Sequence, residues 1–221
     1  MPHTITHVIF DMDGLLLNTE PFYTEAHEIM ASRYGKVFDW SVKSRMIGLP
    51  AQTSAQRMID ALQLPMSVAE YLEMRAPILE KLFPGAEPMP GAVSLTHRLH
   101  DLGIPQAVAT SSTTHHFHLK TSRHSDWFGL FKLVVTGDDP AVKRGKPNPD
   151  IFLHVAENLS AVPENCLVFE DSPAGIEAAS AAGMHSVAVP DPHMSDGEYS
   201  KADQIIRSLA DFDLSFWGLP S

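Results

Sequence analysis

Short apolar runs alternate with helix-period segments from Gly91 to the end of the chain, and this alternation is the feature that most constrains the fold. The apolar runs predict strands over Ile104–Ala109, Leu133–Val135, Leu167–Phe169 and Ser186–Val189. The segments between them predict helices over Ala92–Leu102, from about Thr114, and over Pro149–Asn158, Pro173–Ala182 and Ala202–Leu209. Strands that alternate with helices are joined by right-handed crossovers, so the sequence predicts an α/β protein with a doubly wound parallel sheet.

Another strand is predicted near the amino terminus, and it ends in two acids. Ile5–Phe10 is short, apolar and β-branched, as buried strands of parallel sheets are. Asp11 and Asp13 follow it, and Gly14 then lets the chain turn sharply. Parallel sheets place ligands at the carboxyl ends of their strands. Because two acids this close repel each other, the pattern predicts either a divalent metal such as magnesium or a general acid that shares a proton.

The stretch between this strand and Gly91 has a different pattern. From Glu20 to about Phe83 the segments are helix-periodic, without a convincing parallel strand. Helices are predicted over Ala51–Leu62 and Ser67–Leu82, followed by a turn-rich linker. The sequence therefore predicts an α-helical subdomain at residues 17–87, inserted into a core domain made of residues 1–16 and 88–221.

The composition is that of an ordinary globular protein. The chain has 221 residues, 44% of them hydrophobic, and a formal net charge of -11. This charge argues against nucleic acid or an anionic membrane as the main partner, and it means that an anionic substrate needs a local arrangement of cations and amides. The single cysteine, Cys166, lies in an apolar run, which favours a buried structural thiol. Without a signal-like or membrane-spanning segment, we expect a cytoplasmic protein. We also expect a monomer.

Two later segments carry groups that could hold an anion. Thr110 and Ser111 follow a predicted strand and precede a helix, where a hydroxyl and free amides form a phosphate site; the ordinary alternative is a helix cap. Lys146 lies in a loop stiffened by prolines and could act as a point charge against a carboxylate and a phosphoryl oxygen. Its ordinary alternative is a solvated surface lysine.

A third segment repeats the arrangement at Asp11. Glu170 and Asp171 follow the run Leu167–Phe169 and precede a predicted helix. They could cap that helix and complement its dipole. Together with Asp11 they could instead form an oxygen-rich site for magnesium.

Four segments resemble the four sequence motifs of the haloacid dehalogenase superfamily, in the same order and at plausible spacing. These segments are Asp11–Gly14, Thr110, Gly145–Pro147 and Glu170–Gly175. Further segments resemble two groups within it, the pseudouridine 5'-phosphatases and the plant glycerol-3-phosphate phosphatases. These are Lys120–His124, Gly137–Pro140 and Trp217–Pro220. The resemblance covers nearly the whole chain and implies a Rossmann-like core with the inserted helices as its cap.

The resemblance also implies a role for each site residue. Asp11 would be the nucleophile that forms an aspartyl-phosphate, and Asp13 would protonate the leaving alkoxide and then deprotonate water. Thr110 and the amide of Ser111 would hold phosphoryl oxygens, while Lys146 balances their charge.

The metal site implied by the resemblance draws on two of the four segments, the first and the last. Magnesium would be bound by the side chain of Asp11, the carbonyl of Asp13 and Asp171, with Glu170 in or next to that shell. It would offset the repulsion between the anionic nucleophile and the anionic phosphate.

The cap implied by the resemblance would close over the site and choose the substrate. Candidate selectors are Glu20, Tyr23 and the loop that contains Gly48. Relatives usually carry aspartate at the position of Asn18, so an amide here puts cap movement or the tuning of the site in question rather than the nucleophile.

The leading functional hypothesis is a magnesium-dependent phosphatase that acts on a small phosphorylated metabolite: a sugar, polyol or nucleoside monophosphate. A β-phosphoglucomutase-like transfer is the first alternative, disfavoured because Tyr23 and Ala51 stand near the places of a cap histidine and arginine in those mutases. Dehalogenation is disfavoured by Asp13 and by the acid pair at 170–171. A non-catalytic phosphometabolite-binding protein is the alternative from another class.

Overall fold

The computed structural model describes residues 4–46 and 51–220 and divides into two compact units. The first unit is Met1–Asn18 together with Glu87–Ser221, and the second is Thr19–Ala86. The second unit is therefore an insertion within the first.

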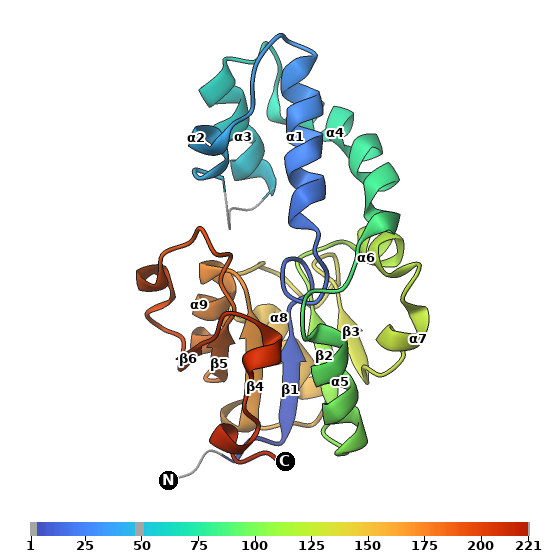
Figure 1. The fold of residues 1–221 in the computed structure, drawn as a ribbon, viewed down its shortest axis with the longest axis vertical. Helices are drawn as coiled ribbons and strands as arrows, with labels where there is room; N and C mark the ends of the chain where they lie inside the picture. The colour runs from blue at the N-terminus through green and yellow to red at the C-terminus, as the bar shows by residue number, and fades with distance from the viewer. Residues whose placement is uncertain (1–3, 47–50, 221) are drawn as a thin grey trace. The chain divides into compact units, whose positions relative to one another are not determined.

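The first unit contains a six-stranded sheet in the order β3-β2-β1-β4-β5-β6 (Figure 1). Its strands are β1 His7–Phe10, β2 Gln106–Ala109, β3 Leu133–Val135, β4 Cys166–Glu170, β5 His185–Ala188 and β6 Gln204–Ile205. Each neighbouring pair is parallel. The predicted doubly wound parallel sheet is confirmed, and β1, which carries the first two acids, lies between β2 and β4.

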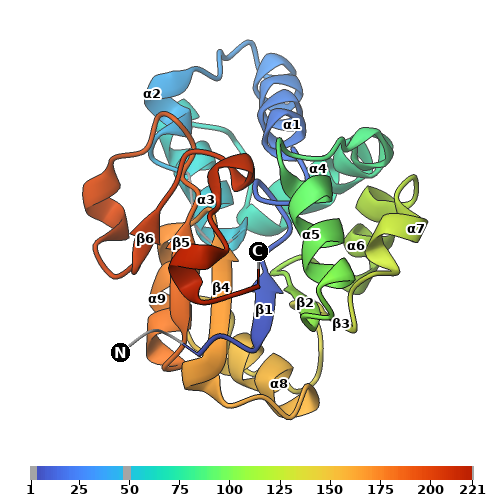
Figure 2. The same ribbon diagram turned by 60° about the horizontal axis from the view of Figure 1, so that its bottom comes forward.

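Helices follow most of these strands and cover both faces of the sheet. They are α5 Ala92–Asp101, α6 Thr114–Thr121, α7 Ser125–Phe128, α8 Asp150–Asn158 and α9 Pro173–Ala181, with short 3-10 turns at Pro163–Asn165, Asp196–Tyr199, Leu209–Asp211 and Ser215–Trp217. Figures 1 and 2 show α5 and the C-terminal turns on one face and α8 on the other. Buried apolar side chains fill the layer between α8, α9 and the sheet, among them Ile9, Val168 and Phe152.

The second unit is helical throughout its described part. It contains α1 Glu20–Ser32, α2 Trp40–Lys43, α3 Ala51–Leu62, α4 Val68–Leu82 and a 3-10 turn at Phe83–Gly85. Ser67 and Glu70 form a capping box at the start of α4, as their spacing predicts. Apolar side chains such as Met30, Met58 and Tyr71 form a core of its own.

One predicted element is wrong. Ala202–Leu209 was expected to be a helix, but Gln204–Ile205 forms the edge strand β6 beside β5. The backbone amide of Ser186 donates to the Asp203 carboxylate, and the Trp217 indole donates to the Gln204 side chain. These contacts with distant parts of the chain outweigh the local helical pattern.

The predicted burial of the lone cysteine is confirmed. Cys166 begins β4 with its side chain fully buried, and this burial raises the pKa of its thiol to about 11. Among the described residues, no helix combines the length and apolar character needed to cross a membrane.

Candidate active site

Three neighbouring strands deliver polar side chains to the same edge of the sheet. Asp11 directly follows β1, Thr110 follows β2, and Glu170 ends β4. The Asp11 amide donates to the Phe169 carbonyl at 3.0 Å, so the parallel pairing continues past the end of β1 and holds this acid beside β4. The chain then closes a tight loop, because the Gly14 amide donates to the Leu17 carbonyl at 2.9 Å.

Lys146 joins all three of these strand ends. Its ammonium nitrogen lies 2.5 Å from Asp11 Oδ1, 2.6 Å from Glu170 Oε1 and 3.0 Å from the Ala109 carbonyl oxygen. A lysine ammonium has three N–H donors, so these three acceptors occupy all of them and fix its position. Glu170 in turn accepts from the backbone amide and the hydroxyl of Ser172.

Burial controls the electrostatics of this group. Glu170 is fully enclosed, and Asp11 is only 6% exposed. Burial raises the pKa of the Asp11 carboxyl to about 7; Lys146 opposes the rise, and the charges of Glu170 and Asp13 add to it. Burial alone would lower the pKa of Lys146, but the Asp11 and Glu170 carboxylates hold it above its usual range.

Asp11, Glu170 and Asp171 form an acidic cluster in which one carboxylate oxygen from each lies within 4.8 Å of the others. Two glycines make room for these acids. A Cβ at Gly14 would collide with the Asp171 carboxylate, and the φ of +80° at Gly14 is itself strained for other residues. A Cβ at Gly175 would collide with the Glu170 carboxylate. The cluster offers only oxygen ligands and carries more negative charge than Lys146 balances, a donor set that suits a hard divalent cation.

Asp13 has a separate set of partners. Its Oδ1 lies 2.5 Å from Lys120 Nζ, and its Oδ2 lies 2.8 Å from Ser112 Oγ and 3.4 Å from Thr110 Oγ1. The Thr110 hydroxyl also accepts from the Ser112 amide at 3.0 Å. The predicted Thr110 is thus fully buried and turned towards Asp13, whereas Ser111 is exposed.

The predicted substrate selectors belong to the helical unit. Glu20 begins α1, and the Tyr23 ring packs edge-on against Phe83 with centroids 5.7 Å apart. Gly48 lies outside the described residues. At the boundary of the first unit, the backbone amide of Asn18 donates to the Glu87 carbonyl at 2.9 Å.

The sequence matches the model of the haloacid dehalogenase-like hydrolase family over residues 5–183. The chain belongs to this family. The matched stretch contains the strand ends described above and the inserted helical unit, so the predicted family is confirmed.

Similar proteins carry phosphatase names. The chain is 48% identical to (DL)-glycerol-3-phosphatase 2 of Arabidopsis thaliana, covering 98% of this chain and 92% of that protein. It is 44% identical to a protein of Drosophila melanogaster named as a probable pseudouridine-5'-phosphatase, covering 98% and 95%. A crystal structure of a protein assigned as a β-phosphoglucomutase in Thermotoga maritima superposes with a TM-score of 0.77, at 30% identity over 97% of each chain.

Sequence reasoning missed two residues of the site, Ser112 and Lys120. Ser112 stands beside the predicted phosphate-binding pair and looked like an ordinary residue before a helix. Lys120 begins the segment Lys120–His124, whose resemblance to relatives assigns this side chain no role. Lys120 and Asp13 are 107 positions apart in the chain, so no local sequence pattern predicts their contact.

Proposed function

We propose that this chain is a magnesium-dependent phosphatase that hydrolyses a small phosphomonoester through an aspartyl-phosphate on Asp11. The observation that carries the proposal is the Asp11 carboxylate, held by Lys146 beside Glu170 at the carboxyl end of the central strand. A carboxylate that is anchored next to a fixed ammonium group, within the acidic cluster, is suited to receive a phosphoryl group. Membership of the hydrolase family and relatives with phosphatase names support it.

The first half of the reaction transfers the phosphoryl group to the enzyme. An Asp11 oxygen attacks phosphorus, the bond from phosphorus to the ester oxygen breaks, and the leaving oxygen takes a proton from Asp13. Lys146 balances the charge on the phosphoryl oxygens. The backbone amide of Ser111, an exposed residue after β2, would hold one of them, and the buried Thr110 orders this loop by accepting from the Ser112 amide.

The second half returns the enzyme to its starting state. Asp13, now a carboxylate, takes a proton from water while the water oxygen bonds to phosphorus. The bond between phosphorus and Asp11 then breaks, which restores the carboxylate and releases inorganic phosphate. The proton that Asp13 gives to the leaving group in the first half is therefore replaced by a proton from water in the second half.

The residues present fit a magnesium ion. The side chains of Asp11 and Asp171 and the backbone carbonyl of Asp13 would hold it, with Glu170 in or next to the shell. When bound, the ion supplies the positive charge that lets an anionic carboxylate approach an anionic phosphate.

The substrate is proposed from the names of the relatives. Glycerol 3-phosphate and pseudouridine 5'-phosphate are comparable candidates, since proteins named for each are 44–48% identical to this chain. Glu20, Tyr23 and Gly48 remain the proposed selectors. The likeness to the Thermotoga maritima protein keeps phosphosugar mutase activity as the second candidate. Cytoplasmic location and the monomeric state stay predictions.

A phosphate-release assay tests the proposal. Purified protein is incubated with glycerol 3-phosphate, pseudouridine 5'-phosphate, or β-glucose 1-phosphate with a trace of the bisphosphate, each with and without magnesium. We expect magnesium-dependent release of phosphate, abolished in Asp11→Asn and unchanged in Asp211→Asn, which alters an exposed acid of the same unit. Formation of glucose 6-phosphate without free phosphate would favour the mutase, and stabilisation by a compound without turnover would favour a binding protein.

A further inference from the structure

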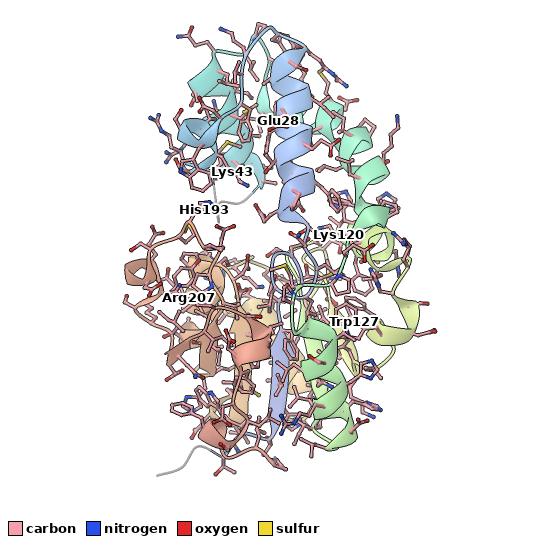
Figure 3. All side chains as sticks on the ribbon, viewed as in Figure 1. Glu28, Lys43, Lys120, Trp127, His193 and Arg207 are labelled. Carbon is pink, nitrogen blue, oxygen red and sulfur yellow. The ribbon has the colours of Figure 1, made fainter. Side chains whose placement is uncertain are left out.

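A second buried lysine lies in the first unit, and it pairs with Asp13 rather than with Asp11. The Lys120 side chain is fully enclosed, while that of Asp13 is 21% exposed. Lys120 lies near the end of α6, and side chains of a helix lean towards its amino terminus, so its ammonium group reaches back to the loop after β2. Figure 3 labels Lys120 on this helix.

The hydrogen bonds among these groups run in one direction only. The Lys120 ammonium can only donate, so the Ser112 hydroxyl, 2.7 Å away, must accept from it. The single hydroxyl hydrogen of Ser112 is then left for Asp13 Oδ2 at 2.8 Å. Lys120 therefore holds Oδ1 of the Asp13 carboxylate, and Ser112 holds Oδ2, which also accepts from the Thr110 hydroxyl at 3.4 Å. Donors on both oxygens fix the carboxylate plane.

A purely structural role explains this arrangement poorly. Enclosing an ammonium group has a large desolvation penalty, and replacing a buried ion pair with apolar residues of similar size is often neutral or stabilising. Lys120 instead pairs with Asp13, the carboxylate that exchanges protons with the substrate in the proposed reaction. Asp11 has its own cation in Lys146.

We propose that Lys120, acting through Asp13 and together with Ser112, is a positioning residue for proton transfer. It holds the Asp13 carboxyl so that its exposed edge faces the ester oxygen. The proton then passes from Asp13 to that oxygen as the bond from phosphorus to oxygen breaks. This inference rests on the proposed phosphatase function, and it adds that Lys120 and Ser112 orient Asp13, the general acid of that reaction.

Two classes of substrate distinguish a role of Lys120 in proton transfer from a purely structural role, because their leaving groups differ in the need for a proton. Glycerol 3-phosphate and pseudouridine 5'-phosphate release an alkoxide that needs a proton, whereas p-nitrophenyl phosphate releases a stable phenolate that does not. For Lys120→Met we expect kcat/KM to fall about 100-fold with the faster of the two alkyl phosphates, within the range of general acid catalysis, and less than about fivefold with p-nitrophenyl phosphate. Lys201→Met is the matched control: Lys201 pairs with Glu177 at 2.7 Å, but both are exposed, and neither substrate should respond.

A double-mutant cycle tests whether Lys120 acts through Asp13. In an Asp13→Asn background, Lys120→Met should reduce alkyl phosphate turnover no further, because the group it positions is already gone. The asparagine background also avoids an unpaired acid if the single variant folds poorly. Ser112→Ala, which leaves both charges in place, should show the same selective loss to a smaller extent.

Four results overturn the inference. Equal losses with both classes of substrate would assign Lys120 a structural role, and so would a full further loss in the Asp13→Asn background. If the wild type hydrolyses alkyl phosphates and Asp13→Asn does not, yet Lys120→Met keeps the wild-type ratio of the two substrates, the inference fails and the proposed function stands. If the wild type releases phosphate from no substrate, both fail.

Discussion

His27 should make the helical unit less stable in acid. It is only 6% exposed, and its Nδ1 lies 2.5 Å from the Tyr71 hydroxyl oxygen. Burial, helped by the positive charges of Arg75 and Lys43, lowers the pKa of this imidazole to about 3. The imidazole is therefore neutral in the folded protein across the range in which an unfolded histidine becomes charged.

The size of the effect follows from the two pKa values of His27. In the unfolded chain a histidine titrates near about 6.5. Between that value and about 3 the unfolded state binds a proton that the folded state does not. The stabilisation is thus fully present above the unfolded pKa and is lost as the pH falls through this window. Between pH 8 and pH 5 the loss due to His27 should be about 2 kcal/mol.

Urea unfolding followed by far-ultraviolet circular dichroism measures this loss. The comparison is between wild type and His27→Gln at pH 8 and pH 5, because groups shared by the two proteins cancel in the difference. Going from pH 8 to pH 5 should lower the free energy of unfolding of wild type by about 2 kcal/mol more than that of His27→Gln. Tyr71→Phe keeps the titrating ring and should retain the pH dependence of wild type. A difference between wild type and His27→Gln that is the same at both pH values would refute the reasoning.

Three further predictions concern single sites. Asp171→Asn should raise the magnesium concentration for half-maximal activity at least about tenfold, and chelation with EDTA should stop phosphate release until magnesium is restored. Gly175→Ala should lower the free energy of unfolding by about 1–3 kcal/mol and reduce turnover, because its methyl group displaces the Glu170 carboxylate; Gly197→Ala, where a Cβ meets only ordinary contacts, should do neither. At pH 8 the thiol of Cys166 should react with a disulfide reagent about 100-fold more slowly in the folded protein than in urea, since burial raises its pKa to about 11; a fast reaction in the folded state would contradict its burial.

The sequence was most informative where chemistry and strand lie next to each other. β1 and β4 are short apolar runs that end in acids, so one local pattern gives both the element and its functional end. Residues at the carboxyl ends of adjacent parallel strands must meet at one edge of the sheet, and Asp11 and Glu170 do so, with Lys146 within hydrogen-bonding distance of both. The hypothesis requires Asp11, Lys146 and Asp171 to surround one phosphate-sized anion. Lys146 contacts Asp11, and oxygens of Asp11 and Asp171 lie within 4.8 Å of each other.

The sequence failed where long-range contacts decide the structure. Residues 202–209 have a helical pattern, yet Gln204–Ile205 pairs with β5 as an edge strand. This strand is only two residues long, which is too short to show a strand periodicity in the sequence. The lysine at position 120 looks like any basic residue near a helix C-terminus, where it would complement the dipole. Its partner lies 107 positions earlier, so its role depends on how the fold brings the end of α6 to the loop after β1.

Asp11 and Asp13 show how a fold gives two identical side chains different tasks. They stand two positions apart, but the first is enclosed beside Lys146 and Glu170, while the second keeps an exposed edge and has Lys120 and Ser112 as partners. A nucleophile must be anchored and face phosphorus, and a proton carrier must reach both the leaving group and water. Because each acid has its own lysine, a change at one pair need not disable the other. Lys146→Met should therefore lower kcat/KM for alkyl and aryl phosphates alike, whereas Lys120→Met should lower kcat/KM chiefly for the alkyl class.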